Sequence, residues 1–214
     1  MKILLVDDHK IFREGVSDIL AKEEFASEII QAADVAEAKQ KITASVPDLL
    51  ITDLSLPGEP GQELIRWIRE NSPATRILCM SMHSDITLMR EVLSLGAAGF
   101  VTKESGFKEL AEAIRRVHTG EIYLDQIMLK RVLEYLDHAS TFKQSADPAL
   151  GELSEREREV FFLLIEGTPL QEISDKLFIS TKTIENHRSK IYKKLGVHDR
   201  LTLINFAREK GMVE

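Results

Sequence analysis

The first half of the chain alternates short apolar runs with longer segments of helical periodicity. Five runs are expected to be strands: Ile3–Val6, Glu28–Ala32, Leu49–Thr52, Ile77–Ser81 and Gly99–Thr102. Runs without polar alternation are typical of strands buried on both faces of a parallel sheet. The intervening and following segments predict helices, at 10–22, 34–45, 60–70, 85–95 and 107–117. Five strand–helix units in about 120 residues predict a doubly wound, five-stranded parallel α/β sheet with helices on both faces.

The pattern changes after residue 120. A helix is expected over about 125–137, and the small, polar stretch HASTFKQSADPALG at 138–151 predicts a linker. From residue 153 onward every pattern is helical, beginning with Ser154 and Glu157 in the spacing of a capping box. We therefore predict an α/β domain at 1–120, a helix and linker at 121–152, and a small all-α domain at 153–214.

Composition is that of an ordinary globular protein, with 43% hydrophobic and 29% charged residues. The apolar runs are shorter than the roughly 20 residues of a membrane span, and a chain that reaches Asp7 so early is not expected to carry a signal peptide. Cys79 is the only cysteine, which excludes an intramolecular disulfide and a thiolate zinc cluster. A cytoplasmic location without membrane contact is the expectation.

Charge is unevenly distributed along the chain. The net charge of −7 argues against a general nucleic-acid coat, yet residues 152–214 hold 11 basic and 11 acidic residues and are neutral. Within them, residues 180–194 hold five basic residues and one acid. Local sign matters more than the total for a polyanion partner, so this segment is the candidate for one.

Polar side chains stand where the predicted parallel strands end, which is the edge where such sheets bind ligands. They are three carboxylates, one hydroxyl and one ammonium group: Asp7, Asp8, Asp53, Ser81 and Lys103. Carboxylates so close together need a cation, and hard oxygen ligands suit Mg²⁺. A metal-bound phosphoryl group could then be transferred to a carboxylate, with Asp53 as the candidate acceptor. Lys103 would hold a phosphoryl oxygen, and Ser81 would donate a hydrogen bond to it.

Each of these residues also has an ordinary structural interpretation. Asp8 could cap the helix that begins near residue 10, Asp53 could simply precede a turn, and Lys103 could be a solvated strand end. Ser81 is a residue type common in loops. The joint placement of the right chemical types at four strand ends favours a site.

These residues resemble the receiver domains of two-component response regulators, which are flavodoxin-like, over residues 1 to about 120. The resemblance implies phosphorylation of Asp53 by a sensor histidine kinase and a switch pair, Ser81 and Phe100. It also implies a Mg²⁺ site formed by Asp8, Asp53 and the backbone carbonyl of Ser55, with Asp7 acting partly through water. Taken alone, Phe100 would more often be a core residue. Glu104 stands where many receivers have proline.

The tail contains LQEISDKLFISTKTIENHRSKIYKKL, two helices joined by a short turn, which predicts a helix-turn-helix. In its second helix Ile184, Ile191 and Leu195 share one face. The other faces mix amide, hydroxyl, acidic and basic groups that suit base edges and phosphates. The candidate DNA contacts are Lys182, Thr183, Glu185, Asn186, Arg188, Ser189, Lys190 and Lys193. A solvated amphipathic helix is the alternative.

This tail resembles the LuxR-type helix-turn-helix of the NarL/FixJ subfamily of response regulators over 153–214, in LSEREREV, STKTIENH and KLGV. Related proteins dimerise through the last helix, here about 199–210.

His187 could be a pH sensor or a metal ligand. Packing beside Ile184 or a phosphate contact is the favoured interpretation, because no cysteine or second histidine lies at metal spacing.

The leading hypothesis is a phosphorylation-controlled, DNA-binding transcription regulator that forms a homodimer when phosphorylated. It would be no enzyme beyond its own aspartyl phosphorylation and dephosphorylation. One alternative is a haloacid-dehalogenase-like phosphatase, but Ser55 stands where that chemistry wants a second acid. Others are a receiver whose tail binds a protein, and a site whose phosphorylation has no role in the cell.

Overall fold

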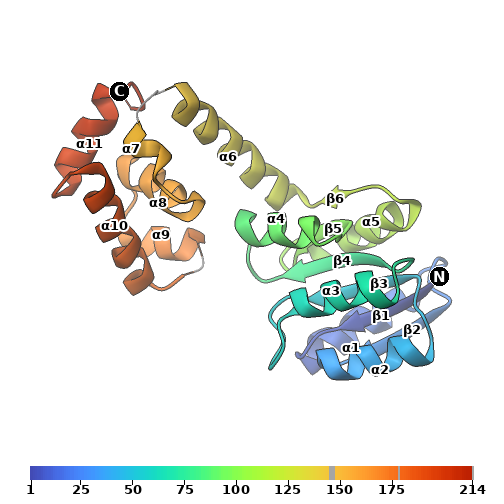
Figure 1. Ribbon diagram of the computed structural model, residues 1–214. Helices are drawn as coiled ribbons and strands as arrows, with labels where there is room; N and C mark the ends of the chain where they lie inside the picture. Colours follow the sequence, from blue (N-terminus) through green and yellow to red (C-terminus); the bar gives the residue numbers. More distant parts are fainter. Residues whose placement is uncertain (145–147, 178, 214) are drawn as a thin grey trace. The chain divides into compact units, whose positions relative to one another are not determined.

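The computed structural model describes residues 1–144, 148–177 and 179–213, and within 137–149 only the backbone. The chain divides into two compact units, Met1–Leu129 and the part from Lys130 onward, and each has its own hydrophobic core. Figure 1 draws the first unit in blue to green and the second in yellow to red. The domain borders predicted at residues 120 and 152 stay predictions.

The first unit is built on a parallel sheet in the order β2-β1-β3-β4-β5-β6. All five predicted strands are confirmed, as β1 (Lys2–Val6), β2 (Glu28–Ala32), β3 (Leu49–Asp53), β4 (Arg76–Ser81) and β5 (Gly99–Thr102). The count of five strands was too low by one. A sixth, β6 (Tyr123–Leu124), pairs in parallel with β5 at Gly99 and Phe100. It has only two residues, so no apolar run marks it in the sequence.

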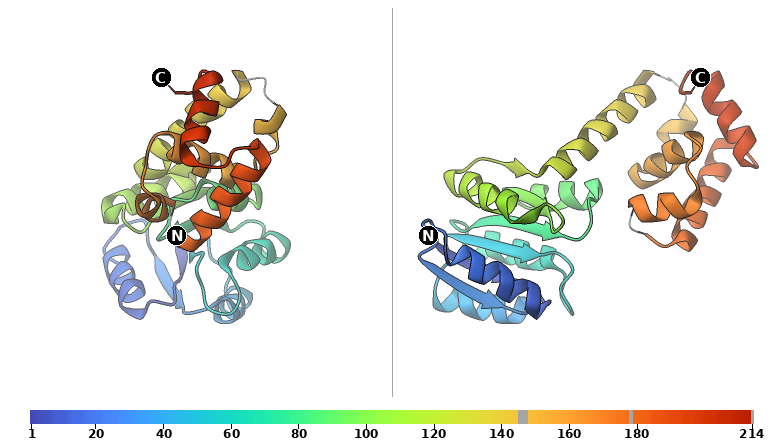
Figure 2. Two further views of the ribbon diagram at one scale, coloured as in Figure 1. Left: turned by 90° about the vertical axis from the view of Figure 1, so that its left-hand side faces the viewer. Right: turned by 180° about the vertical axis from the view of Figure 1, so that it is seen from behind.

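Helices cover both faces of this sheet (Figure 1; Figure 2). On one face α1 (Lys10–Leu20) and α5 (Gly106–Thr119) pack on alternate strand residues such as Ile3 and Leu5. The intervening strand residues are equally buried, because successive side chains point to opposite faces. The other face is covered by α2 (Val35–Ala44), α3 (Gly61–Asn71) and α4 (Ile86–Ser94). Burial on both faces explains the unbroken apolar runs.

Among the described residues of the second unit, every secondary-structure element is a helix. Its elements are α6 (Gln126–Gln144), which begins in the first unit, α7 (Pro148–Gly151), α8 (Glu155–Ile165), α9 (Leu170–Leu177), α10 (Thr181–Leu195) and α11 (Arg200–Glu209). The prediction of a linker at 138–151 was wrong for most of its length, because 138–144 continue α6 and 148–151 form α7; residues 145–147 lie outside the described part. The serine, threonine and glycine content there favoured a loop, but a helix already begun adds residues at little cost.

Local signals place the starts of these helices. The Ser154 hydroxyl accepts a hydrogen bond from the backbone N–H of Glu157, and the Glu157 carboxylate accepts one from the N–H of Ser154, which confirms the predicted capping box. At α10 the Ser180 hydroxyl accepts a hydrogen bond from the backbone N–H of Thr183, without the reciprocal bond, and α10 ends at Gly196 in the left-handed conformation.

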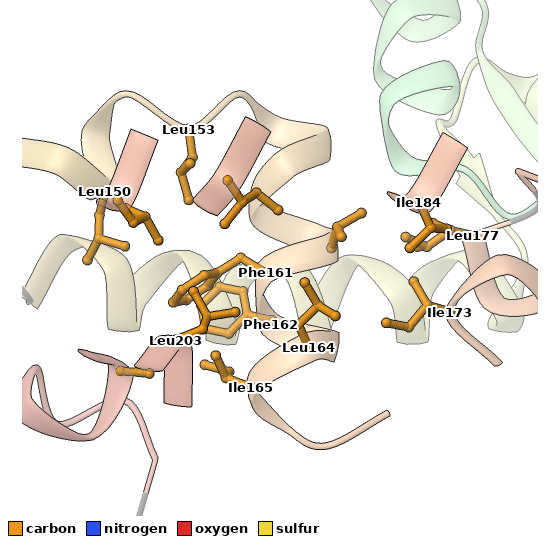
Figure 3. Close-up of a cluster of buried hydrophobic side chains, with 14 residues drawn as sticks. Leu150, Leu153, Phe161, Phe162, Leu164, Ile165, Ile173, Leu177, Ile184 and Leu203 are labelled. Atoms are coloured by element: carbon orange, nitrogen blue, oxygen red, sulfur yellow. The ribbon is translucent and has the colours of Figure 1, made fainter. Parts of the chain in front are cut away.

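The core of the second unit joins α7, α8, α9, α10 and α11 (Figure 3). Phe161 and Phe162 of α8 lie at its centre in an edge-to-face arrangement, with ring centroids 5.6 Å apart. Ile173 of α9, Ile184 of α10 and Leu203 of α11 belong to the same cluster and are fully buried. The apolar face predicted for α10 therefore faces this core, and its remaining faces are left for other contacts.

Candidate functional site

Three acidic residues and one lysine lie together at the carboxyl ends of the strands; we call Asp7, Asp8, Asp53 and Lys103 the acidic pocket. Asp7 follows β1 and Asp53 ends β3, which are neighbouring strands, so the fold brings together residues 46 positions apart. The side chains of Asp7 and Asp53 are 0% and 1% exposed, whereas that of Asp8 is 32% exposed. The pocket thus combines two buried carboxylates with one that reaches solvent.

Lys103 joins the two buried carboxylates. Its Nζ lies 2.6 Å from Asp53 Oδ2 and 2.7 Å from Asp7 Oδ2, and its side chain is 4% exposed. Burial alone would lower the pKa of this ammonium group, but the hydrogen bonds and the negative charges of Asp53 and Asp7 outweigh burial and raise the pKa. The aromatic ring of Phe12 lies against it, with its centroid 4.7 Å from Nζ. Lys103 is therefore a fixed positive charge inside the pocket.

Backbone contacts hold the carboxylates in place. The N–H of His9 donates to Asp7 Oδ1 over 2.8 Å, and the N–H of Ser55 donates to Asp53 Oδ1 over 3.0 Å. Gly61, at the start of α3, packs directly on the backbone of Asp53, because a Cβ atom there would lie 2.5 Å from the Asp53 carbonyl oxygen. Only glycine allows α3 to begin so close to the acidic pocket.

Ser81 and Phe100 occupy the two strands beyond β3. Asp53 pairs with Met80, so Ser81 lies one position further along the neighbouring strand. Its side chain is buried, and its hydroxyl oxygen accepts a hydrogen bond from the N–H of His83. Phe100 is fully buried in β5. That placement is compatible with both the core role and the switch role considered for Phe100.

The donor set of the pocket fits a divalent cation. Asp7, Asp8, His9 and Asp53 each offer one ligand atom, and these four atoms all lie within 4.8 Å of one another. Sequence reasoning predicted the three carboxylates but missed His9 and Phe12. His9 directly follows the acidic pair, which was the available signal, whereas the approach of Phe12 to Lys103 depends on how α1 packs beside β5.

The second candidate surface is the outer face of α10. Of the eight predicted contact residues, those that are exposed are Lys182, Asn186, Ser189, Lys190 and Lys193, and those that are half-buried are Thr183, Glu185 and Arg188. Two hydroxyls are already used within the helix: that of Thr183 is 2.8 Å from the Ser180 hydroxyl, and that of Ser189 donates to the Glu185 carbonyl. The amide of Asn186 and the ammonium groups of Lys182, Lys190 and Lys193 are exposed on this face.

Lys194, near the end of the same helix, has a structural role. Its Nζ is 2.7 Å from the buried carboxylate of Glu157 and 2.9 Å from the Glu152 carbonyl oxygen. Burial would raise the pKa of Glu157, but hydrogen bonds from Lys194 and Ser154 outweigh it and lower the pKa. His187 is half-buried, and burial, followed by the nearby charges of Arg156 and Lys190, lowers its pKa. That environment fits the packing role expected for His187.

Comparison with known proteins assigns both units to families. The response regulator receiver domain matches residues 3–115, and the luxR family of bacterial regulatory proteins matches residues 151–207. The chain belongs to the response regulators: it joins a receiver domain to a LuxR-type DNA-binding domain and is a phosphorylation-regulated transcription regulator. Among the described residues, no helix is both long and apolar enough to span a membrane.

Individual relatives are similar over the full length. The oxygen regulatory proteins NreC of Staphylococcus haemolyticus and Staphylococcus epidermidis are 36% and 38% identical, and each alignment covers 100% of both chains. A Salmonella typhimurium RcsB response regulator structure has a TM-score of 0.62 at 27% identity, covering 97% of this chain and 98% of that one. An RcsB–DNA complex has a TM-score of 0.60 at 28% identity, covering 100% and 99%.

Proposed function

We propose that Asp53 accepts a phosphoryl group from a sensor histidine kinase and that this event controls DNA binding by α10. The observation that carries the proposal is the buried contact of Lys103 with both Asp7 and Asp53. A carboxylate at a strand end beside a fixed ammonium group is suited to accept a phosphoryl group, because the ammonium group stabilises the negative charge on the phosphoryl oxygens.

Within this pocket the Asp53 carboxylate attacks phosphorus, and the bond to the donor breaks as the new O–P bond forms. The Lys103 ammonium group holds one phosphoryl oxygen, and the Ser81 hydroxyl donates a hydrogen bond to another. Mg²⁺ bound by Asp7, Asp8, Asp53 and the Ser55 carbonyl would supply charge neutralisation for the transfer. Asp53 is therefore the acceptor, and its neighbours bind and orient the group.

The new charge would be transmitted through Ser81 and Phe100. Movement of Ser81 toward the phosphoryl group leaves space that the Phe100 ring can occupy, which changes the surface of α4, β5 and α5. Phosphorylated chains would pair as homodimers and present two copies of α10 to a two-fold-related DNA site. Two weak half-site contacts then combine into one strong one.

On DNA, α10 would lie in the major groove. Asn186 and Glu185 are placed to read base edges, while basic residues hold phosphates. The proposed contact set is Lys182, Thr183, Glu185, Asn186, Arg188, Ser189, Lys190 and Lys193. RcsB–DNA complexes among the similar structures support this use of the fold.

We propose that the receiver spans residues 1–120, the connecting helix and linker 121–152, and the DNA-binding domain 153–214. We expect the protein to act in the cytoplasm. We also expect no catalysis beyond its own aspartyl phosphorylation and dephosphorylation.

Intact-mass measurement tests the proposal directly. The protein is incubated with acetyl phosphate and Mg²⁺, and wild type is expected to gain the mass of one phosphoryl group while Asp53→Asn gains none. Asp48→Asn is the matched control, because Asp48 is exposed just before the opposite end of the same strand and should be phosphorylated normally. Wild type without added mass would contradict the phosphoryl switch and leave DNA binding as a separate question.

A further inference from the structure

We propose that His9 is an additional ligand of the divalent cation at the acidic pocket and that it makes the pocket prefer first-row transition cations such as Ni²⁺ and Zn²⁺ over Mg²⁺. The inference rests on the proposed function, in which a divalent cation binds beside Asp53. It adds a nitrogen donor to a site otherwise made of oxygen ligands.

The position of the imidazole carries the proposal. His9 Nδ1 lies 2.9 Å from Asp8 Oδ1 and 3.5 Å from Asp7 Oδ1. Together with Asp53, these residues offer four donor atoms within 4.8 Å of one another. Nitrogen and oxygen ligands lie about 2.0–2.2 Å from such cations, so ligands on opposite sides of one ion are roughly 4.2 Å apart. Small side-chain movements therefore suffice for all four to bind one ion.

The backbone fixes His9 without using its ring. The His9 N–H donates to Asp7 Oδ1, which ties the residue to the pocket. His9 also occupies the N-cap position of α1, yet its side chain makes no capping hydrogen bond. The ring is 67% exposed, so a cation can reach it from solvent. The described contacts of the ring are those of Nδ1 with Asp8 and Asp7, so a bound cation would take the place of any proton that Nδ1 shares with Asp8.

The carboxylates keep capacity for a cation while they contact Lys103. A carboxylate offers about four lone-pair positions. Asp53 accepts hydrogen bonds from Lys103 at Oδ2 and from the Ser55 N–H at Oδ1. Asp7 accepts the His9 N–H at Oδ1, and its buried Oδ2 forms an ion pair with Lys103 but has no hydrogen-bond partner among the described residues. The ammonium group also offsets part of the negative charge. A ligand set with one nitrogen and three carboxylates can therefore form without displacing Lys103.

The nature of the donor determines the preference. Mg²⁺ favours oxygen ligands, keeps several waters and loses them reluctantly, so a nearby imidazole adds little to its binding. Imidazole nitrogen is a good ligand for Ni²⁺, Cu²⁺ and Zn²⁺, whose affinities for mixed nitrogen and oxygen sites exceed that of Mn²⁺. Removal of His9 should consequently weaken binding of the transition cations far more than binding of Mg²⁺.

Calorimetric titration of the untagged, full-length protein with NiCl₂ and separately with MgCl₂ tests this inference. The variants are His9→Ala and, as the matched control, His118→Ala, which removes an exposed imidazole near the end of α5. We expect His9→Ala to weaken Ni²⁺ binding by about tenfold or more and to change Mg²⁺ affinity by less than about twofold. His118→Ala should match wild type for both ions.

A spectroscopic measurement identifies the coordinating atom. In ¹H–¹⁵N spectra of the imidazole groups, added ZnCl₂ should shift Nδ1 of His9 and leave His118 unchanged. Equal Ni²⁺ affinity in wild type and His9→Ala, or unshifted His9 nitrogens, would overturn the inference while the Mg²⁺ site stands. If wild type bound neither Mg²⁺ nor Ni²⁺, the metal part of the proposed function would fail as well, so the two failures are distinguishable.

Discussion

The acidic pocket and the outer face of α10 are both rich in charged residues, but they differ in how their charges are held. In the pocket, Asp7 and Asp53 are buried and share the ammonium group of Lys103 at 2.6–2.7 Å. On α10, Asn186 and Lys193 are exposed to solvent. The buried charges of the pocket contact one another, whereas the exposed groups on the helix face are available to solvent or to a partner.

Solvent explains why this difference matters. A charge pair in the interior interacts far more strongly than the same pair in water, and salt screens it much less. Loss of one member of the buried set should therefore affect folding, whereas loss of one exposed lysine should affect only binding. The four predictions below test that contrast, from the largest expected effect to the smallest.

Lys103→Met should destabilise the receiver more than any other single change considered. It leaves two buried carboxylates without their shared cation, and we expect the free energy of unfolding to fall by about 3 kcal/mol in the absence of divalent ions. Added Mg²⁺ should recover part of the loss. Urea unfolding followed by circular dichroism, with and without Mg²⁺, measures both effects.

Lys108→Met is the control, because Lys108 is exposed on α5 five residues further along. It should change the free energy of unfolding by less than about 0.5 kcal/mol. If the two variants were equally stable without Mg²⁺, burial of the pocket charges would not be what orders the site, and the contrast with α10 would fail.

Gly61→Ala should be the next most damaging change. Its Cβ would lie 2.5 Å from the Asp53 carbonyl oxygen and 2.9 Å from the Leu54 Cα atom, and backbone cannot move aside as a side chain can. A loss of about 1–3 kcal/mol is expected, with slower phosphorylation of Asp53. Thermal unfolding and the intact-mass assay measure these two effects.

Gly15→Ala, in the same unit, should stabilise the protein where Gly61→Ala destabilises it. Gly15 lies within α1, and nothing is within 4 Å of a Cβ placed there, so alanine should stabilise the protein by roughly 0.5–1 kcal/mol. Similar destabilisation in both variants would mean that the close approach of α3 to Asp53 is not the cause.

The sequence was sufficient to predict much of the acidic pocket. Parallel strands end at one edge of a sheet, so Asp7, Asp53 and Lys103 could be placed together once the strands were recognised. Their chemistry then indicated a cation and a phosphoryl group. Apolar runs buried on both faces gave the strands their clear boundaries, and the capping signals at Ser154 and Ser180 did the same for two helices.

Other features depend on contacts that no local pattern records. The two-residue strand β6 exists because Tyr123 meets Gly99, and α6 extends through residues whose composition favours a loop. The position of Phe12 beside Lys103 follows from how α1 packs on the sheet. On α10, periodicity separated the buried face from the polar face but could not show that Lys194 turns inward to Glu157.

Glu157→Gln removes a buried charge from the helical unit, which therefore contains both buried and exposed charged residues. The pair of Glu157 with Lys194 should contribute about 1 kcal/mol at neutral pH. Because folding lowers the pKa of Glu157, this contribution is complete above the ordinary glutamate value of about 4.3 and is lost as the pH falls through the lower folded-state value. Wild type and variant should thus differ at pH 7 and converge as the pH falls below the ordinary glutamate value, as measured by urea unfolding over a series of pH values. A difference that is constant with pH would show that shape, and not charge, explains the effect.

Lys193→Ala should have the smallest effect on folding and a specific effect on binding. Its side chain is exposed, so the free energy of unfolding should change by less than about 0.5 kcal/mol. If Lys193 contacts a phosphate, affinity for duplex DNA should fall by a similar factor for every sequence. The slope of log K against log salt concentration should become shallower by about one unit.

Asn186→Ala is the comparison, because loss of a base contact should reduce discrimination at one base pair and leave the salt dependence unchanged. Fluorescence anisotropy over a range of KCl concentrations separates the two outcomes. An unchanged salt dependence in Lys193→Ala would remove that residue from the DNA-binding surface, whereas a loss of folding stability would place it, like Lys194, among the residues that hold the helical unit together.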